Sequence, residues 1–317
     1  MKKKLFIVSI LLLSVFLSAC SQTKNTDNKS TNTSQTKTTS NSINYLNKNY
    51  TVKAPTSKIV TASFESMEDA VALNFHPIGA VTISEEMPGY LKNKLGKGVA
   101  NIGDKFGPNV ESVAALKPDI ILGSTKFDEK VTSNLTKIAP TINVSHKSDD
   151  WEKNLMLMGT LTGKLEKAKN LISNYEKDLK DFKKNNPEIT NKKIMIIRIR
   201  EGELCIYGED FYYNPMLYKD LGFSMPKELD AVKGQTTISK EQLSKINSDI
   251  ILVQFMASEN KGFPNALKDL KNDTLWKNIP AVAKDNVFYN VVDGGYQGGT
   301  YLSKEVMLKA LNEKVFK

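Results

Sequence analysis

A short segment occurs twice in this chain, and the repetition restricts the folds that the chain can adopt. The sequence "ESVAALKPDIIL" begins at Glu111, and "EQLSKINSDIIL" begins at Glu241. Aligned without a gap, both copies begin with a glutamate and end with the group Asp-Ile-Ile-Leu. Each copy predicts a short helix that begins at its glutamate, followed by a turn and a buried strand.

Further elements recur around the two copies. The segment "KIVTASFESMEDAVALNF", residues 58–75, predicts a strand followed by a helix. The segments "TINV" (141–144) and "VFYNVV" (287–292) predict short strands at corresponding places after the two copies. Strands that alternate with helices, in two related sets, predict two similar α/β lobes. Chance similarity between common strand and helix patterns is the alternative.

A long amphipathic segment separates the two sets. Apolar residues from Leu165 to Phe182 follow helical spacing, and Asn186 and Pro187 end the pattern. About 22 helical residues would span roughly 33 Å, enough for a stiff connection. We therefore predict an α/β fold of two similar lobes joined by one long rigid helix, with a ligand cleft between the lobes. The predicted ranges are 45–162 for the N-terminal lobe, 163–188 for the connecting helix and 189–317 for the C-terminal lobe.

The first 20 residues have the features of an export signal. Lys2, Lys3 and Lys4 precede an apolar stretch, which is too short and wrongly flanked for a membrane span. We predict a signal peptide over residues 1–19. The sequence "LSAC" at its end resembles the bacterial lipobox, which implies that Cys20 becomes the first mature residue and carries lipid. An ordinary secretory signal with an incidental cysteine is the alternative.

A polar segment follows this cysteine. Residues 21–43 are rich in Ser, Thr, Asn, Gln and Lys and contain no aromatic residue. Such a composition cannot bury enough apolar surface to offset the entropy of the chain. We therefore predict that residues 20–44 are a lipidated cysteine and a disordered tether. The protein would be exported and held on the outer face of the cytoplasmic membrane, in a Gram-positive cell envelope.

Charge and cysteine content exclude several classes of protein. The formal net charge is +9, but the lysines are spread along the chain without a dense basic block, which argues against nucleic acid as a partner. With Cys20 lipidated, Cys205 would be the only other cysteine, so no intrachain disulfide is expected. We expect a monomer.

The chain contains only two arginines, Arg198 and Arg200, in the apolar run "IMIIRIR". Residues two apart in a strand point to the same face, and ligands of α/β sheets gather at the carboxyl ends of the strands. The planar guanidinium group matches carboxylate oxygens, so the pair favours an anionic ligand. The alternative is a surface network with neighbouring acids, namely Glu201, Glu203, Glu209 or Asp210.

Several segments, taken in order, resemble one known family. They are residues 57–81, 101–123, 137–144 and 274–292, together with the long helix and the lipobox. They resemble the substrate-binding lipoproteins of bacterial ABC importers for iron–siderophore complexes, haem and cobalamin. The resemblance implies two α/β lobes on a rigid helix, with the ligand in the cleft. It also implies a receptor that performs no bond chemistry and delivers its ligand to an ABC permease driven by an ATPase.

The resemblance also assigns a docking role to one acidic residue on each lobe. The matching positions are Glu111 and Glu241, the glutamates that begin the repeated segment. In that family these carboxylates bind arginines of the permease. The alternative for both residues is stabilisation of a helix start, where the helix dipole favours a negative charge.

We predict that the ligand is a ferric chelate. Two histidines cannot form a site for bare metal, so iron would arrive already chelated and no metal would be bound directly by the protein. The arginine pair favours ferric citrate or a citrate-based siderophore. Hydroxamate siderophores follow, then catecholates, then haem or cobalamin. The predicted ligand-binding residues are Arg198, Arg200, Lys126, Gln254, Tyr296, Gln297, Tyr213 and Ser63.

Two other classes of protein remain as alternatives, an exported enzyme and an adhesive lipoprotein. The sequence contains no G-x-S-x-G, H-E-x-x-H or Walker motif, which argues against an enzyme. We expect no covalent cofactor other than the lipid on Cys20.

Overall fold

The computed structural model describes residues 39–83 and 86–316. The predicted signal peptide, Cys20 and most of the predicted tether lie outside these residues. Within them, no helix is both long enough and apolar enough to cross a membrane.

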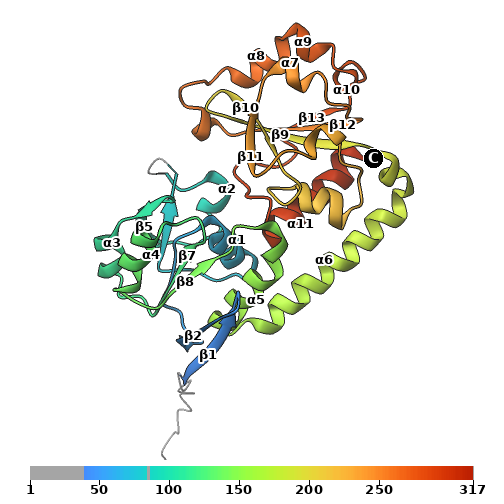
Figure 1. Ribbon diagram of the computed structural model, residues 1–317. Helices are drawn as coiled ribbons and strands as arrows, with labels where there is room; N and C mark the ends of the chain where they lie inside the picture. Colours follow the sequence, from blue (N-terminus) through green and yellow to red (C-terminus); the bar gives the residue numbers. More distant parts are fainter. Residues whose placement is uncertain (1–38, 84–85, 317) are drawn as a thin grey trace, which may run out of the picture. The chain divides into compact units, whose positions relative to one another are not determined.

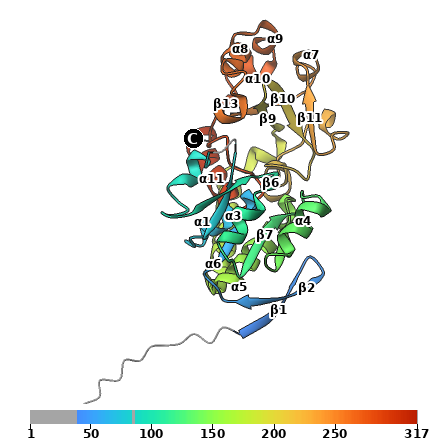
Figure 2. The same cartoon turned by 90° about the vertical axis from the view of Figure 1, so that its left-hand side faces the viewer.

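The described chain begins with a two-stranded antiparallel hairpin, β1 (Thr39–Tyr45) and β2 (Lys48–Ala54), seen in Figure 2. The prediction that the tether extends to residue 44 is therefore wrong for residues 39–44. Ile43 and Tyr45 alternate toward the interior and are buried. The Tyr45 hydroxyl donates to Asn154 Oδ1 at 2.5 Å and accepts the Ser145 N–H at 2.7 Å. The polar composition of this segment concealed a strand with one buried face.

The first sheet has six strands in the order β6-β5-β4-β3-β7-β8, and all neighbours are parallel except β5 and β6. Its strands are β3 (Ile59–Thr61), β4 (Gly79–Thr82), β5 (Ala100–Asp104), β6 (Gly107–Pro108), β7 (Ile120–Ser124) and β8 (Thr141–Val144). The helices between them are α1 (Phe64–Ala72), α2 (Gly89–Lys92), α3 (Val110–Ala115) and α4 (Glu129–Thr136). The sheet falls within the range predicted for the N-terminal lobe.

The second sheet has five strands in the order β11-β10-β9-β12-β13. Its strands are β9 (Ile194–Arg200), β10 (Glu203–Tyr207), β11 (Gln235–Ile238), β12 (Ile250–Phe255) and β13 (Val287–Tyr289). The associated helices are α7 (Lys240–Leu243), α8 (Ala266–Asn272), α9 (Thr274–Lys277) and α10 (Pro280–Ala283). Strand β9 is buried on both faces: Ile194 and Ile196 join one core cluster, while Met195, Ile197 and Ile199 join another.

Both copies of the repeated segment form a helix and a strand, as predicted. The first copy gives α3 and β7, and the second gives α7 and β12. The helices begin one residue before the shared glutamate, with Asn109 and Ser239 as caps whose side-chain oxygens accept a backbone N–H three residues later. Glu111 and Glu241 are therefore second residues of their helices, and both are exposed.

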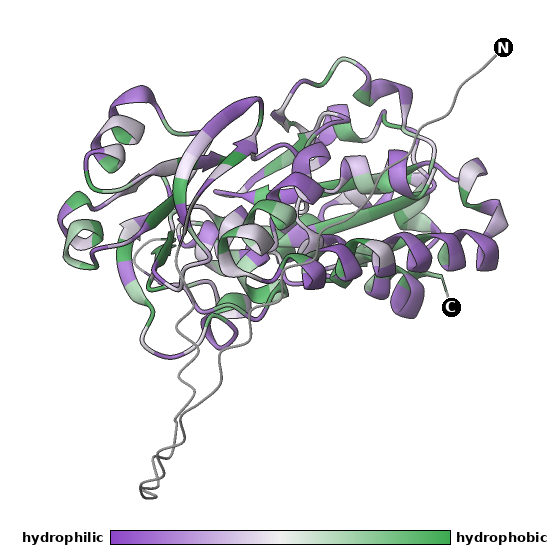
Figure 3. Cartoon of the chain, turned by 90° about the horizontal axis from the view of Figure 1, so that it is seen from below, coloured by the Kyte–Doolittle hydropathy of each residue, from purple (hydrophilic) through white to green (hydrophobic). Residues whose placement is uncertain are grey.

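A long helix connects the two sheets. Helix α5 (Trp151–Thr162) leads into α6 (Leu165–Asn185), whose 21 residues correspond to roughly 31 Å. Ala168, Tyr175 and Phe182 are its buried residues, seven positions apart, so one stripe faces the core. Figure 1 shows α6 running from α5 toward the second sheet, and Figure 3 shows the hydrophilic colour on its outer turns. The predicted fold class, two α/β lobes joined by one long helix, is confirmed.

The C-terminal helix α11 (Tyr301–Ala310) packs against α1, α5 and α6, and its apolar side chains belong to a core cluster that also includes Ile194 and Ile196 of β9. The last segment of the predicted C-terminal lobe, residues 189–317, therefore also contacts the first half of the chain. The remaining short helical turns are Ser148–Asp150, Pro187–Asn191, Pro215–Asp220, Lys227–Leu229, Ala257–Asn260 and Leu311–Val315.

A buried carboxylate joins this returning segment to α1. Glu68 is 0% exposed and accepts hydrogen bonds from the Tyr90 hydroxyl at 2.7 Å and the Gln297 N–H at 3.0 Å. The Ser303 hydroxyl donates at 2.5 Å, and the Thr300 hydroxyl donates as well. Burial raises the pKa of Glu68, although all four hydrogen bonds favour the charged form.

Replacing Glu68 with alanine would leave these donors without their acceptor. We expect Glu68→Ala to lower the free energy of unfolding by about 3 kcal/mol, since buried polar groups that lose a partner are strongly destabilising. Chemical denaturation would measure the change, with Glu176→Ala on the exposed side of α6 as the control. Equal stabilities for the two variants would contradict a structural role for Glu68.

Candidate functional site

A cleft of about 360 Å³ lies between the two sheets. Both halves of the chain contribute to its walls, and the carboxyl ends of the parallel strands supply most of the polar side chains. The lining residues from the first half are Ser63, Phe64, Glu65, Lys105, Phe106, Ser124, Lys126, Phe127 and His146. From the second half they are Arg198, Arg200, Tyr207, Phe211, Tyr212, Gln235, Glu259 and Gln297.

The position of these side chains follows from sheet topology. Ser63, Lys126 and His146 come after β3, β7 and β8, three neighbouring parallel strands. Arg200 ends β9, and Glu259 follows β12, the parallel neighbour of β9. Loops at the carboxyl edge of a parallel sheet meet on one side, which is where open α/β sheets bind ligands.

Three of the cations that line the cleft gather around Glu259. Arg198 contacts its carboxylate through Nε at 3.0 Å and Nη2 at 2.9 Å. Arg200 Nε lies 3.4 Å from the same carboxylate, and Lys105 Nζ lies 3.8 Å from it. Arg200 also donates to Gln235 Oε1 at 2.6 Å. Both arginines therefore form ion pairs with Glu259 inside the cleft. Neither forms one with the alternative partners considered from the sequence, namely Glu201, Glu203, Glu209 and Asp210.

A second ion pair lies on the opposite wall, where Lys126 Nζ is 3.6 Å from Glu65. Next to it, His146 Nδ1 is 2.8 Å from the Thr125 hydroxyl. Burial lowers the pKa of His146, and the charge of Lys126 lowers it further.

Aromatic rings surround the cations. The Arg198 guanidinium lies 5.3 Å from the centre of the Tyr212 ring, and Tyr212 in turn lies 4.7 Å from Tyr207. Lys105 Nζ lies 5.6 Å from the Phe64 ring and 5.1 Å from the Phe106 ring. A cation is attracted to the face of an aromatic ring, so these contacts orient both the cation and the ring.

The structure brings five of the eight predicted ligand-binding residues together in this cleft: Ser63, Lys126, Arg198, Arg200 and Gln297. The other three are buried and do not line it. Gln254 and Tyr213 are 0% exposed, and Tyr296 packs against the Tyr90 ring at 4.3 Å. Ser63 also caps α1 by accepting the Ser66 N–H.

Sequence reasoning missed Lys105, Glu259 and most of the aromatic wall. Lys105 lies in the turn between β5 and β6, and Glu259 lies in a short turn of helix after β12. Both segments follow the carboxyl end of a strand, which is the reason that Lys126 was predicted to face the cleft. The sequence did not indicate which of several charged residues in these loops faces inward.

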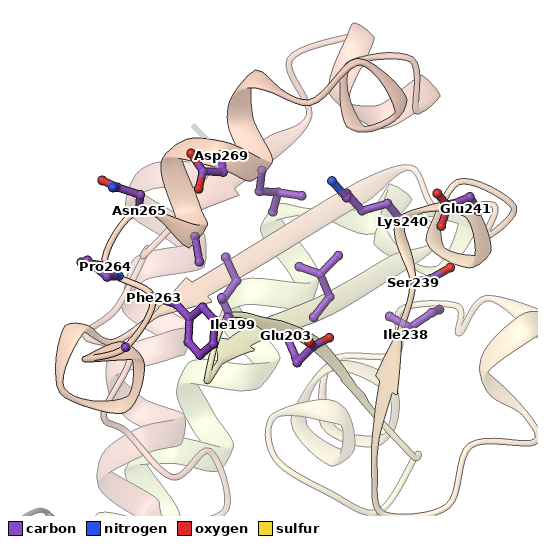
Figure 4. Close-up of a pocket in the computed structure, with 15 residues that line it drawn as sticks. Ile199, Glu203, Ile238, Ser239, Lys240, Glu241, Phe263, Pro264, Asn265 and Asp269 are labelled. Carbon is purple, nitrogen blue, oxygen red and sulfur yellow. The ribbon is translucent and has the colours of Figure 1, made fainter.

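A second pocket of about 520 Å³ lies away from the cleft, between α7 and α8 (Figure 4). Ile199, Ile238 and Phe263 line it, and Glu241 lies at its edge. Only Glu241 among the predicted functional residues is found there. Within residues 39–83 and 86–316, no group of three or more His, Cys, Asp and Glu side chains is arranged to hold a metal ion.

The two arginines are expected to differ in their effect on stability. The Arg198 side chain is 6% exposed and makes two contacts with Glu259, whereas that of Arg200 is 30% exposed. We expect Arg198→Ala to lower the free energy of unfolding by about 3 kcal/mol, because it breaks a buried ion pair. For Arg200→Ala we expect about 1 kcal/mol or less. Urea denaturation of both variants would test this, and the reverse order would disprove the structural assignment.

Comparison with known proteins agrees with this architecture. The family model described as "Periplasmic binding protein" matches residues 59–290. The iron-uptake system-binding protein of Bacillus subtilis is 46% identical over 84% of this chain and 85% of its own length. The probable siderophore-binding lipoprotein YfiY of Bacillus subtilis is 30% identical over 99% of this chain and 100% of its own.

Among solved structures, the triscatecholate siderophore-binding protein FeuA from Bacillus subtilis, in complex with ferri-bacillibactin, superposes with a TM-score of 0.83. It is 46% identical, and the match covers 87% of this chain and 98% of that one. The resemblance inferred from the sequence is confirmed, and the chain belongs to the periplasmic binding protein family.

Proposed function

We propose that this protein is the extracellular receptor of an iron ABC importer and that its cleft binds an anionic ferric chelate of the tris-catecholate class. The observation that carries the proposal is the composition of the cleft. Four cationic and six aromatic side chains line one opening between two sheets. As a receptor, the protein binds and releases its ligand and performs no bond chemistry.

Charge supports an anionic ligand. The cations Lys105, Lys126, Arg198 and Arg200 outnumber the carboxylates of Glu65 and Glu259 by two. Partly buried charges are screened less than surface charges, so this excess attracts a polyanion strongly. A ferric tris-catecholate carries several negative charges on its iron-binding oxygens, whereas a ferric hydroxamate is close to neutral.

The aromatic wall distinguishes catecholates from citrate. Citrate-based chelates lack aromatic rings, while catechol rings can stack on Phe and Tyr side chains and lie against cations. The sequence favoured citrate because the two guanidinium groups appeared free to bind carboxylates. In the structure, Nε and Nη2 of Arg198 already face Glu259, and Nη1 of Arg200 faces Gln235. Among the candidate ligands, we therefore place catecholates first and citrate-type chelates second, which reverses the order inferred from the sequence.

The similarity to FeuA supports the same ligand class, because that protein was solved with ferri-bacillibactin and is described as binding a triscatecholate siderophore. Anchoring through lipid on Cys20, delivery to a permease with its ATPase, and docking through Glu111 and Glu241 belong to the same proposal. Their support is the lipobox, the resemblance to importer lipoproteins, and the exposure of both glutamates at equivalent places on two helices.

A titration with chelates of different class tests the proposed ligand. We expect a ferric tris-catecholate to quench the fluorescence of the two tryptophans saturably, and a ferric hydroxamate to bind much more weakly. Arg200→Ala should weaken tris-catecholate binding by about 1.5–3 kcal/mol, typical of a lost hydrogen bond to a charged group. Lys177→Ala, on the exposed side of α6, is the control. Stronger binding of the hydroxamate would refute the catecholate assignment.

Docking is tested by a double variant. We expect Glu111→Ala with Glu241→Ala to leave chelate affinity unchanged and to abolish uptake of radioactive iron by cells. The matched control is Glu129→Ala with Glu166→Ala, which removes two other glutamates from first turns of helices. Normal iron uptake by cells with Glu111→Ala and Glu241→Ala would show that Glu111 and Glu241 only stabilise their helices.

A further inference from the structure

Glu259 gathers cations from both halves of the chain around one carboxylate. Arg198 and Arg200 approach it from β9, and Lys105 approaches it from the turn between β5 and β6. The Glu259 side chain is only 7% exposed, so these contacts are shielded from solvent. The cleft therefore contains an anion of its own before any ligand arrives.

This anion is needed because the surrounding cations repel one another. Three positive groups lie within 4 Å of the same carboxylate, at 2.9, 3.4 and 3.8 Å. Burial lowers the pKa of Lys105, the charge of Glu259 raises it, and the charges of Arg200, Arg198 and Lys126 lower it again. Without Glu259, the ligand-free cleft would hold an uncompensated positive cluster.

We propose that Glu259 is an internal counter-anion that competes with the ligand for the cleft's cations and so sets the negative charge that a ligand must carry. A chelate with several negative charges gains more from Lys105, Lys126, Arg198 and Arg200 than it loses by repulsion from one carboxylate. A neutral chelate offers these cations no replacement for Glu259. The inference rests on the proposed function, because it concerns selectivity at the same cleft.

The variant Glu259→Gln tests the inference. Glutamine keeps the shape of the side chain and an oxygen that accepts from Arg198, but it removes the charge. We expect affinity for a ferric tris-catecholate to rise about tenfold or more. Affinity for a neutral ferric hydroxamate should stay within about twofold. Weaker tris-catecholate binding would overturn the proposal and make Glu259 a residue that only positions the arginines. An equal rise for both chelates would also overturn it.

A second measurement needs no ligand and separates this inference from the proposed function. In ligand-free Glu259→Gln, sulfate should occupy and screen the exposed cations. We expect sulfate to raise its Tm by about 2–4 °C more than that of the unmodified protein. The matched control is Asp149→Asn, which removes a carboxylate 2.9 Å from Lys219, outside the cleft.

The outcomes of the two measurements are distinct. If the unmodified protein binds no ferric chelate, the proposed function fails, while the sulfate series still tests Glu259. If Glu259→Gln and Asp149→Asn respond to sulfate equally, the counter-anion role is overturned whatever the chelates do.

Discussion

The buried contact between α1 and the C-terminal segment makes the cleft possible. Two sheets joined only by one helix would be free to move about that helix. Glu68 accepts four hydrogen bonds and fixes the segment before α11 to α1, close to the first sheet. Together with α6, this second connection holds the carboxyl edges of the two sheets toward a common cleft. Every cation of the site depends on that arrangement, because the cations come from both sheets.

The chemistry of the cleft follows from the same geometry. Strand ends from the two sheets bring Lys105 and Lys126 into one cleft with Arg198 and Arg200, although these residues are far apart in the sequence. Such a cluster needs compensation in the absence of ligand, and Glu259 supplies it. Aromatic side chains line the same cleft, and under the proposed function they would favour ring-bearing anions over anions without rings.

The sequence predicted the features that are encoded locally. The repeated segment, the helical spacing after Leu165 and the alternation around Arg198 each correspond to an observed element. Features that depend on contacts across the chain were missed. Glu259 is 61 residues from Arg198, so no local pattern links them. Likewise, α11 lies beside α1 through contacts that strand and helix periodicity does not encode. Strand β1 was missed because its composition is mostly polar.

The most direct measurement is the anomalous scattering of iron in a crystal of the protein with a ferric tris-catecholate. We expect an iron peak between the two sheets, flanked by Lys105 and Lys126 from the first half of the chain and by Arg198 and Arg200 from the second. A peak in the pocket between α7 and α8, or no peak under saturating chelate, would contradict it.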